Sequence, residues 1–388
     1  VSQLKYATRW KSEKGCPDAP VLSLYRDFGV VPKDSRNDNH NVTSLDTSNY
    51  KVVDIGDLVI NKMKAWQGSM AVSDYRGIVS PAYHVCSITS NKVNKRYLHH
   101  LLRNPAYLPE YARLSTGMRI GQWDLGFDDF KNIPFLIPPL DEQAKIADYL
   151  DNGCASLDVI LDKTRSSIEE YKKLKQAVIT QAVTKGVRGE REMKDSGNPW
   201  FGQIPTDWKL SRVGLHFSII LGKMLCNAPL NDTYTLEPYY CAADVHFDGV
   251  ADGERKKMWF SPVEKELYRV SVGDLLVVEG GAGAGGSAIV ENQDSYTYIQ
   301  NSIMIVRSKG NTDNRYLRYL LEFLVKQGYI DVVCNKATIP HFTKDKLSCV
   351  PFCLCPTGEQ KEIADYLDAK CAEIDKLIAK KEQLVKEL

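Results

Sequence analysis

The chain has 388 residues, of which 43% are hydrophobic and 26% are charged, and its formal net charge is +1. This composition is typical of a soluble globular protein, and the length favours two domains over one. No apolar run approaches the roughly 18 residues that a membrane-spanning helix needs, and Val1 to Lys14 lacks the apolar core of a secretory signal. We therefore expect a cytoplasmic protein without a membrane segment. The net charge neither favours nor excludes a nucleic-acid partner.

The first part of the chain is predicted to be mixed, with strands dominating. The run Asp57 to Asn61, DLVIN, has strand composition and lies between turn-forming residues. Lys95 to Arg103 carries apolar residues at spacings of three and four, which predicts an amphipathic helix.

A long amphipathic helix is predicted after Pro138 and Pro139. Asp141 is expected to be its N-cap and Gly186 its stop. Apolar residues recur near seven-residue spacing with Glu and Lys between them, as in a coiled coil. This stripe consists of Ile146, Leu150, Leu157, Ile160, Ile168, Tyr171, Leu174 and Val178.

The rest of the chain repeats this order. Strands are predicted at Asp274 to Val278 and Ile303 to Val306, and a helix at Asn314 to Gln327. A second long helix then runs to the chain end. Each stripe needs a partner, so we expect the two helices to form an antiparallel coiled coil, and a helix of roughly 40 residues would be about 60 Å long. The second stripe consists of Ile363, Leu367, Ile374, Leu377, Leu384 and Leu388.

An internal repeat organises the whole chain. Residues 142–158, EQAKIADYLDNGCASLD, match residues 359–375, EQKEIADYLDAKCAEID, without a gap at a shift of 359 − 142 = 217, and eleven of the 17 positions are identical. The same shift brings Gly56-Asp57-Leu58 onto Gly273-Asp274-Leu275. The stretches that follow, KMKAWQGSM and EGGAGAGGSA, differ. A repeated frame with divergent loops indicates two related modules that recognise different targets.

The repeated sequence Glu-Gln-x-x-Ile-Ala-x-Tyr-Leu-Asp, preceded by proline, resembles the specificity subunits of type I restriction-modification systems. Lys194 to Leu210, KDSGNPWFGQIPTDWKL, is similar to the usual start of a recognition domain in that family, with Trp200, Ile204, Pro205 and Trp208 in the expected places. The likeness covers essentially the entire chain. A first copy of this segment is missing, because VSQLKYATRW at the start already resembles Leu210 to Phe217, and the last helix is shorter than the internal one. We therefore expect a truncated N-terminus.

The resemblance implies an α+β fold with an internal pseudo-twofold repeat. Two β-rich, mixed target-recognition domains are expected at 1–139 and 191–356. The central long helix, at 140–190, would be a spacer, and the C-terminal helix, at 357–388, would pair with it as an antiparallel coiled coil. The interface stripe would consist of Ile146, Leu150, Leu157, Ile168, Leu174, Ile363, Leu367, Ile374 and Leu377.

The resemblance also implies the function of a DNA-specificity subunit in phage defence. Such a subunit reads a two-part target in double-stranded DNA, one half per domain, across a spacer of unspecified sequence. It recruits two methyltransferase subunits, which use S-adenosylmethionine to methylate adenine, and in larger assemblies restriction or motor subunits, which use ATP and Mg²⁺. The chain itself is expected to be non-catalytic and to bind no cofactor.

Sequence reading needs side chains that reach base edges and basic residues that hold phosphates. The divergent loops offer both, although a single surface lysine is usually only solvated. Loops 119–127 and 336–344 occupy matching places just before the repeated proline anchors. The candidate DNA-binding residues are Lys62, Lys64, Trp66, Gln67, Arg119 and Gln122 in the first module and Lys223, Lys336, Thr338, His341 and Lys344 in the second.

The other chemistry-bearing patterns have a structural interpretation. The glycine-rich run Gly280 to Gly286 leads into another predicted strand and lacks the P-loop lysine, so we predict a flexible hairpin loop rather than a nucleotide site. The ten cysteines contain no C-x-x-C pair, and no histidine joins a cysteine at zinc-ligand spacing, so we expect reduced thiols and no metal.

Three alternative functions can be compared with this one. A single-chain nuclease or methyltransferase would need a catalytic domain for which the length leaves no room, and no Asp-Pro-Pro-Tyr-type methyltransferase motif is present. A protein-interaction scaffold would lack the salt-dependent DNA affinity that phosphate contacts produce. A specificity subunit of another phage-defence system would share the features described.

Overall fold

The computed structural model describes residues 1–35, 46–117, 123–292, 296–334 and 340–388. The chain divides into two compact units, Val1–Ile160 and Leu161–Leu388. Helix α4 (Leu140–Lys185) begins in the first unit and ends in the second. No helix among the described residues is long and apolar enough to cross a membrane.

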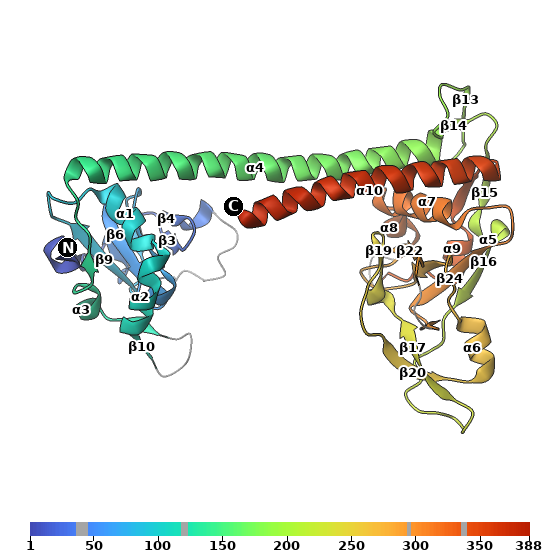
Figure 1. The fold of residues 1–388 in the computed structure, drawn as a ribbon, viewed down its shortest axis with the longest axis horizontal. Helices are drawn as coiled ribbons and strands as arrows, with labels where there is room; N and C mark the ends of the chain where they lie inside the picture. Colours follow the sequence, from blue (N-terminus) through green and yellow to red (C-terminus); the bar gives the residue numbers. More distant parts are fainter. Residues whose placement is uncertain (36–45, 118–122, 293–295, 335–339) are drawn as a thin grey trace. The chain divides into compact units, whose positions relative to one another are not determined.

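The first unit contains a four-stranded antiparallel sheet of order β2-β9-β6-β7, covered by helix α1 (Figure 1). Its inner strand β6 is entirely buried, and the three residues at its centre, Leu58 to Ile60, are apolar. The described strands are β1 (Ser2–Gln3), β2 (Thr8–Lys11), β3 (Leu22–Tyr25), β4 (Gly29–Pro32), β5 (Lys51–Val53), β6 (Asp57–Asn61), β7 (Met70–Val72), β8 (Gly77–Val79), β9 (Tyr83–Ile88), β10 (Ser115–Thr116), β11 (Asp124–Leu125) and β12 (Pro134–Phe135). The helices before α4 are α1 (Lys95–Arg103), α2 (Leu108–Leu114) and α3 (Phe127–Phe130), with short 3₁₀ turns that include η3 (Ala65–Gln67).

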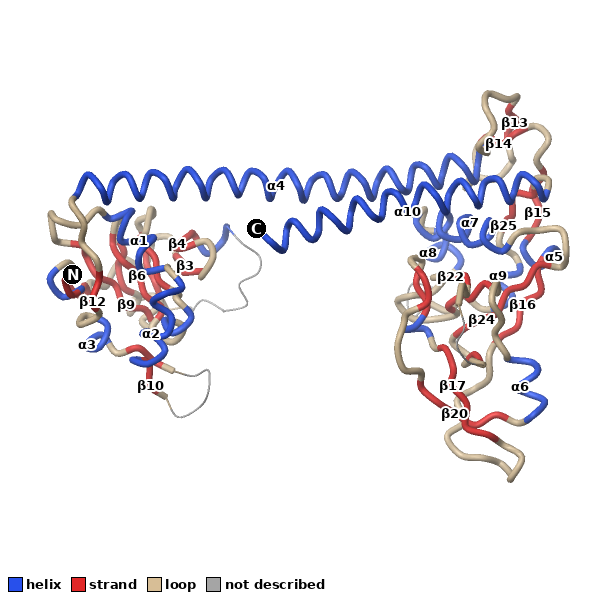
Figure 2. The backbone as a smooth tube through the Cα atoms, viewed as in Figure 1, coloured by secondary structure: helices blue, strands red, loops and turns tan. Residues whose placement is uncertain are grey.

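The second unit contains a sheet with the same plan, of order β16-β24-β21-β22, and helix α7 beside it (Figure 2). A separate three-stranded sheet, β20-β17-β23, has no counterpart of that order in the described part of the first unit. The strands are β13 (Met193–Asp195), β14 (Gln203–Pro205), β15 (Lys209–Arg212), β16 (Phe217–Leu221), β17 (Thr235–Tyr240), β18 (Val245–His246), β19 (Gly249–Val250), β20 (Lys256–Phe260), β21 (Leu275–Val278), β22 (Ser287–Ile289), β23 (Tyr298–Ile299), β24 (Ile303–Ser308) and β25 (Pro351–Leu354). The helices are α5 (Val213–His216), α6 (Pro262–Tyr268), α7 (Asn314–Lys326), α8 (Tyr329–Val333), α9 (Lys344–Ser348) and α10 (Thr357–Glu387).

The predicted elements agree closely with these bounds. The predictions for β6 and α1 are confirmed at both ends, and those for β21, β24 and α7 within two residues. The glycine-rich run is confirmed as the hairpin connection between β21 and β22. Gly186 follows the last residue of α4 with a φ of 78°, in the left-handed conformation that ends many helices.

The predicted N-cap of α4 is wrong. The helix begins at Leu140, and its first bond runs from the Gln143 N–H to the Pro139 carbonyl. Asp141 instead lies in the first turn, where its carboxylate faces the positive end of the helix dipole.

The repeated sequence motif attaches each long helix to the preceding domain helix. Arg96 of α1 contacts Asp148 at 2.7 Å and Asp151 at 2.5 Å. Arg315 of α7 contacts Asp365 at 2.8 Å and Asp368 at 2.7 Å. The residue numbers of the two aspartate pairs differ by the repeat shift of 217. In each unit the duplicated carboxylates therefore bind one arginine of the preceding helix.

The repeated glutamine completes this attachment. The Gln143 Oε1 accepts from the Asn94 N–H at 2.8 Å, and its Nε2 donates to the Pro138 carbonyl at 2.7 Å. In the second unit, the Gln360 Oε1 accepts from the Asp313 N–H at 3.1 Å, and its Nε2 donates to the Cys355 carbonyl. Both glutamines are fully buried, so the side chain satisfies backbone groups that would otherwise lack partners.

Helix α10 runs antiparallel to the part of α4 that belongs to the second unit (Figure 1). The Lys175 Nζ bonds Asp375 at 2.7 Å, and the Lys381 Nζ lies 5.8 Å from the centre of the Tyr171 ring. The residue numbers rise along one helix as they fall along the other. Ile179, Val183, Ile363 and Leu367 are fully buried in the core of this unit.

The stripe predicted for these helices is only partly buried. Ile168 and Ile374 are buried, Ile146 and Leu150 are half-buried, and Leu157 and Leu377 are 41% and 37% exposed. Leu174 is 48% exposed, contrary to its predicted place in the stripe, because the seven-residue spacing continues from Ile168 through Tyr171 to Lys175. Lys175 keeps its charged end in the pair with Asp375.

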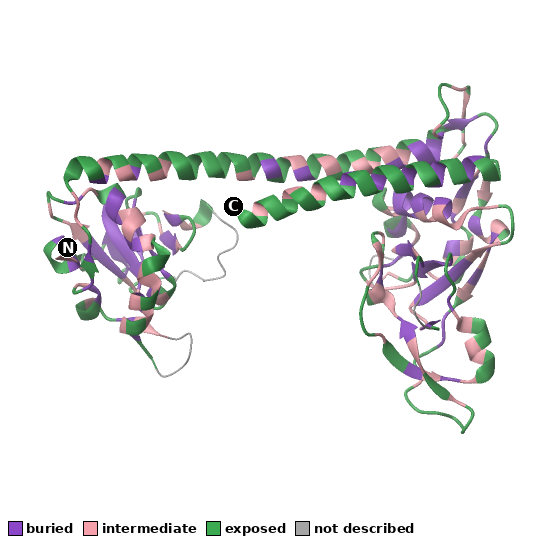
Figure 3. Ribbon diagram, viewed as in Figure 1, coloured by how far each residue is buried: buried purple, intermediate pink, exposed green. Residues whose placement is uncertain are grey.

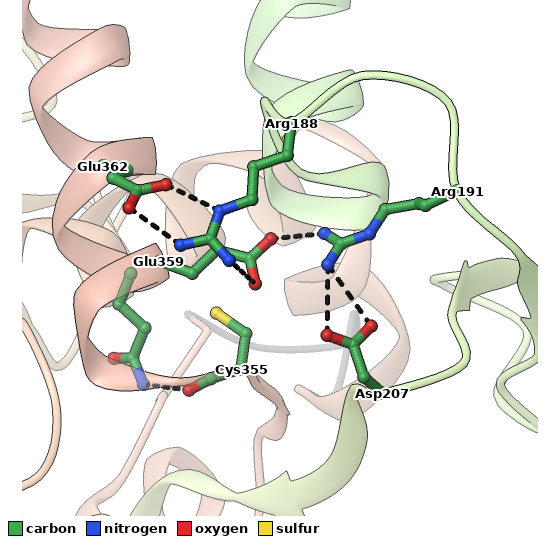
Figure 4. Close-up of polar contacts among 7 residues, drawn as sticks. Arg188, Arg191, Asp207, Cys355, Glu359 and Glu362 are labelled. Carbon is green, nitrogen blue, oxygen red and sulfur yellow. Dashed lines mark hydrogen bonds and ion pairs between the residues drawn. The ribbon is translucent and has the colours of Figure 1, made fainter.

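An ion-pair network closes the junction between α4 and α10 in the second unit (Figure 4). The carboxylate of Glu359 is fully buried and bonds Arg191. Arg188 pairs with Glu362 at 2.8 Å, and Arg191 pairs with Asp207 at 3.1 Å. The network joins the segment after α4 to the first turn of α10.

Candidate nucleic-acid interface

Two loops that are far apart in sequence meet in the first unit. One follows β6 and contains the η3 turn, and the other precedes α3. The Leu125 N–H donates to the Lys62 carbonyl at 3.0 Å. The Lys62 Nζ pairs with Asp124 at 2.8 Å, and the rings of Trp66 and Trp123 pack edge to face with centres 5.2 Å apart. We call this pair of loops the first paired-loop site.

His84 holds the base of this site. Its Nε2 lies 3.1 Å from the Leu125 carbonyl, which can only accept, so this nitrogen carries the hydrogen. The residue is 8% exposed, and burial lowers the pKa of His84, with Lys51 and Lys62 adding to the effect. The histidine is therefore neutral near pH 7, and it ties strand β9 to the second loop.

The second unit joins its two equivalent loops in the same way. The Phe342 N–H donates to the Glu279 carbonyl at 2.6 Å, and the Gly281 N–H donates to the Pro340 carbonyl at 3.1 Å. Gly280 forms a β-bridge with His341, whose Nδ1 would lie 3.2 Å from a Cβ at Gly280. The glycine therefore permits the close approach of the two loops. We call this pair the second paired-loop site.

The two sites share a backbone bond and differ in side chains. The shift of 217 takes Lys62 to Glu279, Asp124 to His341 and Leu125 to Phe342, so the clamping hydrogen bond is the same one in both units. At these positions the first site carries a Lys–Asp pair with Trp66 and Trp123 nearby, and the second carries Glu279 and His341, with two glycines directly after Glu279. Different donors and acceptors on one frame can distinguish different base edges.

Several predicted site residues lie in these loops. Lys64 and Gln67 are exposed and Trp66 is half-buried in the first paired-loop site, and Lys62 is part of the ion pair. His341 and Lys344 are exposed in or next to the second. Trp123 and His84 were missed, because a lone histidine in a strand and a tryptophan in a polar loop give no distinct signal. Arg119, Gln122, Lys336 and Thr338 lie outside the described residues.

Lys223 differs from its prediction. It is 9% exposed, its Nζ pairs with Glu264 at 2.5 Å, and the ammonium lies 4.9 Å from the centre of the Tyr234 ring. The Lys223 ammonium is paired with Glu264 inside the unit, so in this geometry it is not exposed for contact with a phosphate.

The described residues contain no cluster of His, Cys, Asp or Glu that could hold a metal ion. All ten cysteines are free, and Cys353 and Cys355 are buried. Burial raises the pKa of the Cys355 thiol to about 12, so this group is an inert, protonated thiol.

The comparisons with known proteins agree with one family. The family model described as the type I restriction modification DNA specificity domain matches residues 13–170 and 205–387. The specificity subunit of the type I restriction enzyme MjaVIII from Methanocaldococcus jannaschii is 32% identical over 94 residues, which are 24% of this chain and 20% of that protein.

Two solved structures have a similar fold. A chain from a study of complex assembly and conformational transition in the type I R-M system has a TM-score of 0.70 at 17% identity, over 100% of this chain and 96% of that chain. The HsdS subunit from Thermoanaerobacter tengcongensis has a TM-score of 0.60 at 17% identity, over 100% of this chain and 94% of that chain.

Proposed function

The chain belongs to the type I restriction-modification DNA specificity family, and on that basis we propose that it selects the DNA target of such a system. Each paired-loop site reads one half of a split target. One observation carries this proposal: the same backbone bond clamps two loops in each unit, while the side chains around it differ in size and charge.

We propose the predicted domain organisation for this function. Residues 1–139 and 191–356 are the two recognition domains, residues 140–190 contain the helix that sets the gap between the half-targets, and residues 357–388 pair with it. The pseudo-twofold relation of the two halves is part of the same proposal. The equal attachment of α1 to α4 and of α7 to α10 supports it.

The catalytic chemistry belongs to partner chains in this proposal. Two methyltransferase subunits would bring S-adenosylmethionine and modify adenine, and restriction or motor subunits, where present, would bring ATP and Mg²⁺. The specificity chain would supply sequence selection alone.

The first test is to express the chain with its neighbouring methyltransferase subunit and to map methylated adenines in genomic DNA by sequencing. A split motif with a fixed gap of unspecified sequence is the expected result. Absence of methylation, together with DNA binding that does not weaken as salt rises, would reject the proposal in favour of a protein-interaction scaffold.

A pair of loop variants tests the division of labour. Lys64→Ala with Gln67→Ala removes exposed donors from the first paired-loop site, and His341→Ala with Lys344→Ala removes them from the second. Each double variant should relax only its own half of the methylated motif, because removing a specific base contact costs about 1–3 kcal/mol at that position. Each serves as the control for the other. An equal effect at both halves would contradict independent reading.

A further inference from the structure

The small sheet β20-β17-β23 is covered on one face. On its other face only the outer part of the β17–β20 hairpin is open, because Tyr240 and Ile299 on that side are buried against β21 and β24. On the buried face, Met258 and Phe260 are almost fully enclosed with Tyr239 and Tyr298. The alternation of a strand then directs Lys257 and Trp259 to the opposite face. Strand β17 places Pro238 opposite Lys257 and Leu236 opposite Trp259.

The open face combines apolar and basic side chains. Leu236 is 49% exposed, Trp259 is half-buried, and Lys257 is exposed. The neighbouring Lys256 is also exposed but lies on the face of Met258. The outer end of the hairpin formed by β17 and β20 is largely coloured as exposed in Figure 3. The one carboxylate of β17, Glu237, lies opposite Met258 on the buried face and is paired with Lys265 at 2.8 Å. A tryptophan left at a surface beside an exposed lysine is typical of binding surfaces, since Trp contributes large contact energies where a partner covers it.

The open face is fixed to the base of the second paired-loop site. The Gln300 N–H donates to the Tyr240 carbonyl at the end of β17, at 3.2 Å. Two residues further along, the Ser302 carbonyl accepts from the Glu279 N–H at 2.8 Å, and Glu279 belongs to the clamp. The sheet is therefore held by backbone bonds to the segment that holds the reading loop.

We propose that the face formed by Leu236, Lys257 and Trp259 is a second DNA-contacting surface of the second unit. This inference rests on the proposed function and extends it. Lys257 would hold a backbone phosphate, and Trp259 with Leu236 would pack on sugar or base edges of the same duplex. The described part of the first unit has the two-stranded pairs β3-β4 and β5-β8 in the corresponding stretch, so the surface would serve one half-target only.

The test uses the full chain and a fluorescent duplex carrying the split motif that methylation mapping recovers. Binding is measured by anisotropy across a KCl series for wild type, Lys257→Ala, Trp259→Ala and Trp259→Phe. Lys257→Ala should reduce the salt slope by about 0.9, the contribution of the one phosphate that it no longer neutralises. Trp259→Ala should weaken binding about tenfold, and Trp259→Phe should restore part of it.

The control is Lys209→Ala, which removes one exposed lysine of the same unit outside this sheet and should keep the wild-type slope. Far-ultraviolet circular dichroism checks that each variant is folded.

Three outcomes distinguish this inference from the proposed function. If wild type binds and His341→Ala with Lys344→Ala loses target preference, but the sheet variants bind like wild type, the inference is overturned while the proposed function stands. If Trp259→Ala keeps DNA affinity but no longer co-purifies with the methyltransferase subunit, the face is a protein surface and the inference is also overturned. If wild type itself shows no salt-dependent binding, the proposed function fails first.

Discussion

Glu142 and Glu359 occupy the same position of the repeated motif and have opposite surroundings. Glu359 is fully buried between Arg188 and Arg191, whereas Glu142 is exposed. The two glutamates are identical in the repeated motif, but their different burial and partners give them different contributions to the free energy of unfolding.

We predict that Glu359→Gln lowers the free energy of unfolding by about 1–3 kcal/mol, because it removes the buried negative charge that bonds Arg191 and leaves that arginine only its ion pair with Asp207. Glu142→Gln, the matched control, should change it by less than about 0.5 kcal/mol. Urea unfolding followed by circular dichroism measures both. Equal effects of the two substitutions would contradict the assigned network.

His99 in helix α1 gives the first unit a pH dependence. Burial lowers the pKa of His99 to about 4, with Arg103 and His100 contributing, and its Nδ1 accepts from the Val72 N–H at 3.2 Å. Below the ordinary pKa of about 6.5 the unfolded chain binds a proton that the folded chain does not, so stability falls as pH drops from about 6.5 towards 4.

We predict that His99→Gln, which can still accept this bond but does not titrate, makes stability less sensitive to pH across this window. The readout is the urea midpoint at pH 7 and at pH 5. His246→Gln, at an exposed histidine, is the control and should follow wild type. An unchanged pH response in His99→Gln would exclude the residue as a source of the acid sensitivity.

At the scale of elements, the end of α4 depends on one backbone conformation. Gly186 has a φ of 78°, and a Cβ there would lie 3.0 Å from Arg191 and Glu359 and 3.3 Å from Trp208. Gly153, inside the same helix, would meet no atom within 4 Å.

We predict opposite effects of alanine at these two glycines. Gly186→Ala should destabilise by about 1–2 kcal/mol or more, because the left-handed conformation is unfavourable for a residue with a Cβ. Gly153→Ala should stabilise by about 0.5–1 kcal/mol, because glycine is a poor residue inside a helix. The thermal unfolding midpoints of the two variants and of wild type measure these effects. Stabilisation by Gly186→Ala would contradict the assignment of Gly186 as the helix stop.

At the scale of the whole molecule, the proposed function gives α4 a measurable role. Seven residues inserted after Ser156, before the part of α4 that packs with α10, would add about 10 Å of helix. The preferred gap between the half-targets should then grow by about three base pairs at 3.4 Å each. Methylation mapping gives the gap directly. Replacing the exposed residues 152–156 by five alanines, which keeps the helix length and Asp151, is the control, and an unchanged gap in the insertion variant would reject the role of α4.

Local patterns in the sequence were sufficient for the elements and the duplication. The bounds of β6 and α1, the stop at Gly186 and the repeated motif all depend on near neighbours in the chain, where side-chain periodicity and glycine conformation act directly. Loop divergence between repeats also predicted where the candidate site lies.

Tertiary structure decided which distant residues meet. Only packing brings Leu125 to Lys62 and Phe342 to Glu279, buries Lys223 against Glu264, and places Lys175 rather than Leu174 in the helix pairing. The open face around Trp259 likewise depends on which side of β20 the core covers. These outcomes follow from contacts between segments far apart in the chain, and the local periodicity that defines an element carries no information about its partner.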